Sequence, residues 1–499
     1  MARRVFLDYC WHLLSCQLGY AFSAPHTVAY SIEAVQEANL ATRFNPLFWQ
    51  CACLSVNAGS SVTQMERAFG EEASDDEEFS SCKNITPDYG KIAKAITQAR
   101  NNGARIELPD INLAEGDFVP DVANNSILFS LQSVSGVNAD LVSTIISNRP
   151  YTSVENFVEK VRPSKQQMFA LLKAGCFDNL YPGKTRGYVT AIYLNIVAKE
   201  SISRKTKLTM SNLPMAEKLG IVPPECAISV RAFKYKKWED ANELVKEEKR
   251  YKIENPGAVR FFEDYCLPRL NATDYYTLGA AYSVSKPALQ KAVDTLMEPL
   301  KQWLSNPSTL DVMYKAELEG FVQENLSKYF AGTESKWEMQ TLHFYHGAHE
   351  LHNVNQAKYD VVNFDNLEET PSPIDYTVGH DGTQRPVYAV HNICGTVVSS
   401  DNNKHIVSLL TNFNTVVDVK FTSFAYNAYN KALGRGDDIP ESDKSWFERG
   451  TLLLISGYRR ENSFVPRAAY ASGQKSAVRL ITGIDRSGTL SLVGQKKGV

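Results

Sequence analysis

The spacing of apolar residues changes once along the chain, and this change limits the folds that the chain can adopt. Up to residue 352 apolar side chains recur mostly at helical intervals, with breaks at prolines such as Pro25, Pro46 and Pro256. Residues 386–499 instead carry five β-branched runs, VYAVHNICGTVV, HIVSLL, TVVDVKF, TLLLISGY and AVRLITGI, with the helical run FAYNAYNKAL among them. Five short strands and one helix in a domain of this length indicate a closed barrel of the OB type.

Residues 353–385 are rich in turn formers and lack a helical period, which predicts a linker before the barrel. The charge changes at the same boundary. Residues 386–499 hold 14 Lys and Arg against 9 Asp and Glu, although the whole chain has 53 against 56 and a net charge of -3. A polyanion site is therefore expected as a local patch, and the C-terminal domain is the more basic part.

The nine cysteines are scattered and form no CxxC pair, so neither a zinc ribbon nor a disulfide framework is expected, and a reducing cytoplasm fits best. No run of apolar residues is long enough to cross a membrane. The apolar residues of segment 1–20 are interrupted by Asp8 and His12, so a signal peptide is not expected.

A small-residue turn, Ser135-Gly136-Val137-Asn138, stands directly before an apolar helix in the string LQSVSGVNADLVSTIISN. Gly136 would let a nucleic-acid backbone approach, and the free amides at the start of the helix would point at a phosphate. The turn predicts contact with duplex DNA. The alternative is a plain connection between two helices, since a single turn of this kind is a weak signal.

Cations beside aromatic rings in the barrel predict single-stranded DNA binding, because phosphates need cations and bases stack on rings. The cations are Lys404, Lys420, Arg459, Arg460 and Arg467, and the rings are Phe413, Tyr458 and Phe464. The alternative is that the rings lie in the barrel core and the cations are solvated.

Several segments together resemble one family. The string ILFSLQSVSGVNADLVSTIISNRPYTSVENFVEKV followed by FALLKAGCFDNL resembles the tandem helix-hairpin-helix region of the bacterial replicative DNA polymerase III alpha subunit, the family C polymerases. Upstream, GYAFSAPHTVAYSIEAVQEANLATRFNPLFWQCACLS resembles the end of that family's fingers domain. LPDIN and WEMQTLHFYHGAHEL resemble two further landmarks, and the barrel stands where the family keeps its OB domain.

The resemblance implies a multidomain, mainly α architecture with a helical fingers remnant, a tandem helix-hairpin-helix region and a C-terminal OB-fold barrel. The expected domains are residues 1–70, the C-terminal part of the fingers; 71–126, an acidic loop, a helix and a connector; 127–184, the hairpin region; 185–352, a helical region of unknown role; 353–385, the linker; and 386–499, the OB fold.

The family's palm, which holds catalytic metal ions on aspartates, has no counterpart in the sequence, so no catalytic residue, metal site or cofactor is expected in this chain. Asp75-Asp76 and Asp437-Asp438 are expected to be solvated. Mg²⁺ is expected in the palm of a partner chain. Of the family's fingers motif only His26 keeps its place, where it could hydrogen-bond a nucleotide phosphate; capping or packing at a helix start is the alternative.

The sequence therefore predicts the C-terminal part of a replicative family C DNA polymerase of phage or bacterial origin, working in the cytoplasm of a bacterial or phage-infected cell. Its expected partners are primer-template duplex, single-stranded template and a palm-bearing polymerase chain, and no membrane. A sliding clamp is a further candidate, although STLDVMY lacks the glutamine of the family's clamp-binding peptide. The alternative function is a non-catalytic DNA-binding or replisome scaffold protein.

Overall fold

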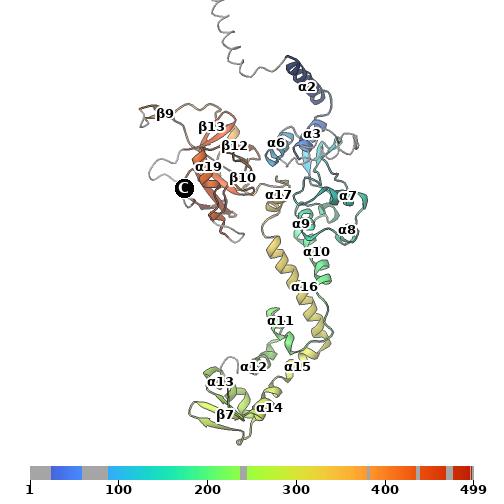
Figure 1. Cartoon of the computed structure of the whole chain (residues 1–499), viewed down its shortest axis with the longest axis vertical. Helices are drawn as coiled ribbons and strands as arrows, with labels where there is room; N and C mark the ends of the chain where they lie inside the picture. Colours follow the sequence, from blue (N-terminus) through green and yellow to red (C-terminus); the bar gives the residue numbers. More distant parts are fainter. Residues whose placement is uncertain are drawn as a thin grey trace, which may run out of the picture. The chain divides into compact units, whose positions relative to one another are not determined.

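The computed structural model describes residues 24–58, 88–235, 244–378, 382–433, 439–467, 476–494 and 496. The chain forms two compact units, Met1–Val189 with Gly332–Val499, and Thr190–Ala331 (Figure 1). The segment predicted as one helical region, residues 185–352, is thus divided, because its end from Gly332 onward belongs to the first unit.

The first unit contains two N-terminal helices, α2 (Ala24–Arg43) and α3 (Pro46–Ala58). Both agree with the helical spacing of apolar residues in this part of the sequence. On α3 Leu47 and Leu54 are buried, whereas Ile32 on α2 is 53% exposed.

Helix α6 (Tyr89–Asn101) begins where the Asp88 side chain accepts a hydrogen bond from the Lys91 amide, 3.1 Å away. A short sheet follows in the order β1-β3-β2. Its strands are β1 (Arg105–Glu107), β2 (Val119–Asp121) and β3 (Ser126–Leu128). The helix agrees with the one predicted within residues 71–126.

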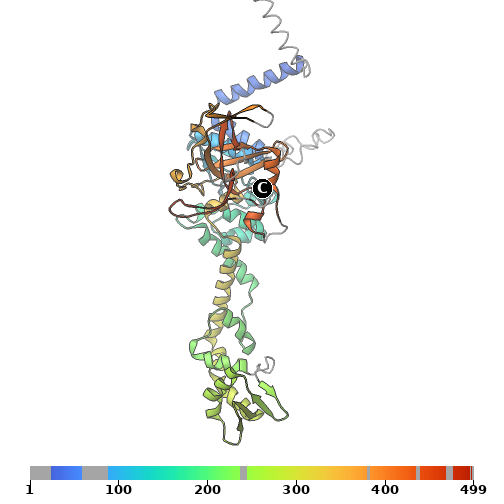
Figure 2. The same ribbon diagram turned by 90° about the vertical axis from the view of Figure 1, so that its left-hand side faces the viewer.

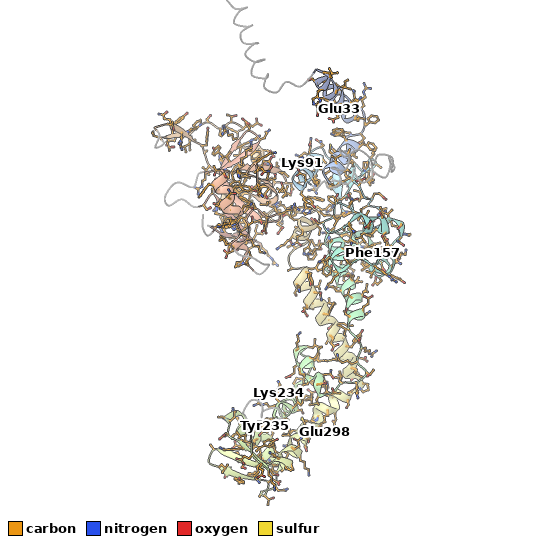
Figure 3. The ribbon with its side chains drawn as sticks, in the orientation of Figure 1. Glu33, Lys91, Phe157, Lys234, Tyr235 and Glu298 are labelled. Atoms are coloured by element: carbon orange, nitrogen blue, oxygen red, sulfur yellow. The ribbon has the colours of Figure 1, made fainter. Side chains whose placement is uncertain are left out.

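Compact helices with short connections make up the hairpin region, as predicted. They are α7 (Ala139–Ser147), α8 (Val154–Val161), α9 (Lys165–Lys173) and η4 (Asp178–Leu180), followed by the start of α10 (Arg186–Ser201). Helices α7, α8 and α9 each begin at a polar cap, Asn138, Ser153 and Ser164, whose side chain accepts a backbone N–H of the first turn. Phe157 of α8 is fully buried among them (Figure 3).

The second unit combines helices with a four-stranded antiparallel sheet that the helical pattern did not predict. The sheet has the order β4-β5-β7-β6, formed by β4 (Leu244–Lys246), β5 (Arg250–Ile253), β6 (Tyr275–Leu278) and β7 (Ala281–Ser285). These strands have only three to five residues, and two of them carry lysine or arginine, so their pattern resembles the solvated face of a helix. The sheet and helix α12 (Ala227–Tyr235) share a core that includes Tyr235 and Ile253 (Figure 3).

The helical segments of this unit are η5 (Met210–Asn212), α11 (Leu213–Lys218), η6 (Pro224–Cys226), α12 (Ala227–Tyr235), α13 (Pro256–Phe261), η7 (Phe262–Cys266), η8 (Leu267–Arg269), α14 (Lys286–Leu296), α15 (Glu298–Ser305) and α16 (Pro307–Tyr329). The STLDVMY string lies within α16, where Leu310 packs against the core of this unit. Helix packing therefore accounts for this string.

The stretch predicted as a linker contains regular structure and contributes to the barrel. Its elements are α18 (Gln356–Tyr359), η9 (Phe364–Asn366), β8 (Asp375–Val378) and β9 (Gln384–Val387). Phe364 is 6% exposed and lies in the barrel core. Helix α17 (Glu334–Thr341) comes before this stretch and packs against α9.

The C-terminal domain is a barrel closed by five strands in the order β10-β11-β12-β14-β13, with β13 pairing back to β10 (Figure 2). All pairs in the ring are antiparallel except β12 with β14. Its elements are β10 (His391–Asp401), β11 (Ile406–Thr411), β12 (Val416–Lys420), α19 (Ser423–Asn430), η10 (Glu441–Asp443), β13 (Leu452–Arg460), β14 (Ser463–Pro466), β15 (Val478–Ile484) and β16 (Leu490–Val493). The predicted fold class, a mainly helical multidomain protein with a C-terminal barrel of the OB type, is confirmed.

The strand that closes the barrel differs from the prediction. The ring is closed by β14, whereas the run AVRLITGI forms β15, which extends the sheet beyond the ring together with β16. β14 has four residues and ends in Pro466, so its sequence carries a weak strand signal. Gly457 permits the close approach of β14, because a Cβ there would collide with the Val465 carbonyl oxygen. In the part of the chain that the structure describes, no helix is long and apolar enough to cross a membrane.

Candidate nucleic-acid interface

The predicted hairpin turn has the backbone that its residues suggest. Gly136 has φ +91°, a conformation in which a residue with a side chain would be strained, whereas a Cβ on it would make only an ordinary contact with the Ala170 Cβ at 3.5 Å. Asn138 is the N-cap of α7, and its side chain accepts a hydrogen bond from the Leu141 amide, 3.2 Å away. The helix therefore starts at the turn, as binding to a phosphate requires.

Part of the turn is already engaged within the protein. The Ser135 amide donates to the Thr341 carbonyl, 2.9 Å away, and the Val137 amide donates to the Val134 carbonyl, 3.0 Å away. The Ser135 hydroxyl lies 2.8 Å from His343 Nε2. These bonds hold Ser135 and Val137 in place, so the groups left for a phosphate are the Gly136 amide and the first turn of α7. Asp140 in that turn weakens the attraction for an anion.

A second helix start lies beside the first. Gln167, in the first turn of α9, donates through its side-chain amide to the Asn138 side chain, 3.2 Å away. Arg162 stands before this helix with φ +51°, and Ser164 caps the helix in a capping box with Gln167. Together with Lys165, Arg162 supplies the positive charge that the turn at residues 135–138 lacks. Neither cation is among the residues predicted above; the signal was the capping pattern Ser-x-x-Gln next to two basic residues.

A chain of side chains links this turn to the barrel. His343 follows α17, is 4% exposed, and packs against the Tyr89 ring of α6 in a tilted contact with a centroid distance of 3.9 Å. The Arg449 guanidinium, just before β13, lies 3.8 Å from the centre of the same ring. Burial lowers the pKa of His343 to about 3, so the imidazole is neutral near pH 7. Figure 1 shows α6 and α17 between the barrel and the hairpin helices.

A buried ion cluster fixes α17 to the end of the hairpin region. Arg186, 5% exposed, pairs with Asp178 and Glu338, each at 3.0 Å. The other oxygen of Glu338 accepts the amides of His346 and Gly347. The loop that carries His343 is thereby held in place, since a buried pair tolerates little movement of either partner.

Two buried histidines that follow α17, His343 and His349, have separate roles. His343 bonds Ser135, whereas His349 accepts the Leu351 amide on Nδ1 and lies 3.1 Å from the Leu410 carbonyl through Nε2. Burial lowers the pKa of His349 to about 4.

Among the predicted barrel residues, Phe464 is in the wrong place for binding. It is fully buried in the barrel core, so it is not available for stacking, and the prediction for this residue is corrected. Phe413 is half-buried and packs beside the core cluster around Leu351. Lys404 and Lys420 are exposed, at the β10–β11 turn and at the end of β12.

The outer face of β13 brings several of the other predicted residues together. Tyr458 and Arg460 are two residues apart in β13 and therefore lie on the same face of the strand. Arg467, just after β14, donates its backbone amide to the Ser456 carbonyl, 3.0 Å away. Two residues that were not predicted join them: the Tyr388 ring lies 4.6 Å from that of Tyr458, and Arg479 is paired in register with Leu454. The charges of Arg467 and Arg479 are close enough to lower the pKa of Arg479, although burial is the larger cause.

Arg459 points to a different environment. Its guanidinium lies 4.6 Å from the centre of the Phe364 ring, pairs with Glu369 at 2.9 Å, and donates to the Leu367 carbonyl at 3.0 Å. These contacts fix the chain that leads into the barrel, so Arg459 is not placed with Arg460.

His26 lies on the exposed surface of α2, with its ring 4.6 Å from that of Tyr30 in an edge-to-face contact. Its predicted role in holding a nucleotide stays a prediction. Asp75, Asp76, Asp437 and Asp438 lie outside the described residues.

The chain is similar in sequence to several known proteins. A model of the helix-hairpin-helix motif matches residues 103–187. The chain is 35% identical over 509 aligned residues to the probable DNA polymerase YorL of Bacillus subtilis (strain 168) and, with the same values, to the DNA-directed DNA polymerase of Bacillus phage SPbeta. Each alignment covers 98% of this chain and 36% of the relative. The DNA polymerase III subunit alpha of Treponema pallidum (strain Nichols) is 27% identical over 200 residues, 39% of this chain and 14% of the relative.

The chain thus spans a little over a third of the length of its Bacillus relatives, as the 36% coverage states. The hairpin region, the barrel and these similarities lead to one assignment: the chain is homologous to a C-terminal portion of phage and bacterial DNA polymerases that are related to the DNA polymerase III alpha subunit.

Proposed function

We propose that the chain supplies fingers, duplex-binding and single-strand-binding modules to template-directed DNA synthesis, together with a separate polypeptide that carries the palm. The observation that carries this proposal is the pair of helix starts at Asn138 and Ser164, joined by the Gln167–Asn138 hydrogen bond. Two adjacent helix N-termini with Arg162 and Lys165 beside them offer amides and charge to the phosphates of a duplex, without reading its sequence.

The outer face of β13 is the proposed single-strand site. Tyr458 and Tyr388 offer rings on which bases stack, and Arg460, Arg467 and Arg479 offer charge to the phosphates. Successive outward residues of a strand are about 6.6 Å apart, so the face presents its groups as a row along which an extended strand can lie.

The metal ions belong, in this proposal, to the palm of the partner polypeptide. In the part of the chain that the structure describes, no group of His, Cys, Asp and Glu could hold a metal ion. The Mg²⁺ of the partner would supply the charge that stabilises the transferred phosphate. In this proposal the chain positions the DNA, and His26 is its proposed contact to the incoming nucleotide. We place the assembly in the cytoplasm of a bacterial or phage-infected cell, with a sliding clamp as a further candidate partner.

Primer extension tests the division of labour. The chain is mixed with the part of the SPbeta DNA-directed DNA polymerase that does not align with it, and each polypeptide is also assayed alone. Extension that requires both polypeptides would support the proposal, and extension by this chain alone would contradict it. DNA binding without any extension in the mixture would favour the alternative, a non-catalytic DNA-binding or replisome scaffold protein. In an active mixture His26→Ala should raise the KM for nucleotide, and His26→Gln, which keeps a hydrogen-bond donor, should raise it less.

A further inference from the structure

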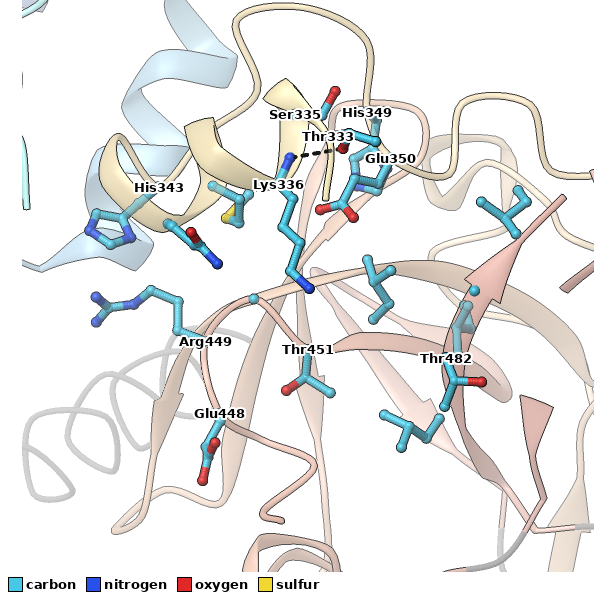
Figure 4. A pocket seen from close by; sticks show the side chains of 18 of the residues that line it. Thr333, Ser335, Lys336, His343, His349, Glu350, Glu448, Arg449, Thr451 and Thr482 are labelled. Atoms are coloured by element: carbon cyan, nitrogen blue, oxygen red, sulfur yellow. Dashed lines mark hydrogen bonds between the residues drawn. The ribbon is translucent and has the colours of Figure 1, made fainter. Parts of the chain in front are cut away.

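A cavity of about 780 Å³ lies between α17 and the barrel, with the hairpin turn at its edge (Figure 4). Ser135 of the turn, Lys336 of α17, and Arg449, Thr451 and Thr482 of the barrel line it. It is therefore a surface that the hairpin region and the barrel share, and none of the predicted DNA contacts accounts for its barrel side.

Two cations, Lys336 and Arg449, line this cavity. Figure 4 shows the Lys336 side chain extending from α17 into the cavity, and the Arg449 side chain below His343 at the edge of the cavity, pointing away from Lys336. Within the described residues, neither side chain forms an ion pair. Lys173 lies close to Lys336. Burial lowers the pKa of Lys173, and the charge of Lys336 lowers it further. An anion close to Lys336 would stabilise the charges of both lysines.

The cavity lining holds three basic residues, Lys336, Lys444 and Arg449, against two acidic ones. One of these, Glu350, accepts a hydrogen bond from the Tyr345 hydroxyl, 3.1 Å away; burial raises its pKa, and the charge of Lys336 acts in the opposite direction. Glu448 is the other carboxylate in the lining, against Lys336, Arg449 and Lys444. The histidines His343 and His349 are neutral near pH 7 because burial lowers their pKa values.

The shape of the cavity restricts the ligand. A cavity of about 780 Å³ has no room for a duplex, whose major groove alone is about 12 Å wide. The Arg449 guanidinium is held in place by the Tyr89 ring and by its bond to the Val398 carbonyl, 3.2 Å away, so it loses little freedom when it binds. The Thr451 hydroxyl, which also lines the cavity, can donate to a phosphate oxygen.

We propose that this cavity binds the phosphodiester backbone of single-stranded DNA next to the hairpin turn, with Lys336 and Arg449 as its phosphate contacts. The proposal rests on the proposed function, because it places the strand between the duplex site and the barrel. A free nucleotide offers the same phosphate chemistry, and the experiment separates the two.

The test measures the affinity of the full chain for a blunt duplex, the same duplex with an oligo(dT) extension, and dATP, over a range of salt concentrations. Lys336→Gln and Arg449→Gln should each weaken binding of the extended duplex roughly three- to tenfold and reduce its salt slope by about 1, because one phosphate contact is lost. Binding of the blunt duplex should not change. Lys336→Arg should keep the affinity. Lys315→Gln, an exposed lysine of α16 that pairs with Glu319 at 3.8 Å, is the matched control and should have no effect.

Equal affinity of the two variants and the wild type for the extended duplex would overturn the inference. An equal loss for the blunt duplex, or a loss confined to dATP, would overturn it as well, since the cavity would then serve a different ligand. If the wild-type chain binds no DNA even at low salt, the proposed function itself fails, and this outcome is distinct from the others.

Discussion

The hairpin region and the outer face of β13 are both proposed to hold DNA, but they use different parts of the chain. In the hairpin region the proposed binding groups are mainly backbone amides, and side chains such as Ser135 fix the turn. On β13 the proposed binding groups are side chains, Tyr458 and Arg460, on a backbone that the barrel holds in place. A backbone site depends on the conformation of a few residues, whereas a side-chain site depends on which face of a strand is turned outward.

The largest expected effect separates core from surface within the barrel. Phe464→Ala should lower the free energy of unfolding by about 3–5 kcal/mol, because it removes a fully buried ring. Tyr458→Ala, on the outer face, should lower it far less. Urea unfolding of the full chain, followed by tryptophan fluorescence, measures both. Equal losses would mean that the two rings do not lie on opposite sides of the sheet.

The next effect concerns pH and the contact between the hairpin turn and the barrel. His343 has a pKa of about 3 when folded, below its ordinary value of 6.5, so the unfolded chain binds more protons between these values. Stability is therefore fully present above about pH 6.5 and falls as the pH drops toward about 3, by up to about 1.4 kcal/mol per pH unit. His349, with a pKa of about 4, acts in the same direction.

Urea unfolding at several pH values checks this prediction. His343→Asn should reduce the slope of stability against pH between pH 6 and 4.5. Val142→Ala in α7, which removes buried methyl groups but no titrating group, is the control and should lower stability without changing the slope. An unchanged slope in His343→Asn would show that this imidazole is not buried in a neutral form.

A smaller effect is expected for the binding of single-stranded DNA to the outer face of β13. Tyr458→Leu should weaken binding of oligo(dT) by about 1–3 kcal/mol, since base stacking is lost while an apolar side chain remains. Tyr458→Phe should bind nearly as well as the wild type. Titration of labelled oligo(dT) by fluorescence anisotropy measures both. If Tyr458→Leu binds like the wild type, the Tyr388–Tyr458 pair is a packing contact only.

The smallest expected effect compares two neighbouring arginines. Arg460→Gln should reduce the salt slope for oligo(dT) by about 1, because it removes a phosphate contact. Arg459→Gln should leave that slope unchanged, since this guanidinium is committed to Glu369, Leu367 and the Phe364 ring. A larger change for Arg459 than for Arg460 would reverse the assignment of the two faces.

The difference between a backbone site and a side-chain site also explains which parts of these regions could be predicted from the sequence. The turn at Gly136 was found because its conformation is encoded by local residue types, glycine and a capping Asn138. Tyr458 and Phe464 could not be told apart, because they lie on different strands and only the pairing of β13 with β14 decides which ring faces inward. Arg479 belongs to this face through its register with Leu454, which local spacing does not contain.

Other features depended on contacts between distant segments. The bond between Ser135 and His343 joins residues 208 positions apart, so the sequence alone could not indicate that the turn was already engaged. The sheet in the second unit was missed because its strands, such as Arg250–Ile253, are too short for their alternation to stand out from a helical pattern.

The most direct test of the account measures duplex and single-strand binding side by side in two variants of the full chain. Gly136→Val should weaken binding of blunt duplex roughly tenfold, because a β-branched residue at φ +91° disturbs the turn, and should leave oligo(dT) binding unchanged. Tyr458→Leu should have the opposite pattern. Gly220→Val, at another glycine with positive φ and open surroundings, controls for strain alone. If each variant weakens both ligands equally, the hairpin region and the barrel do not divide DNA binding between them, and the account is contradicted.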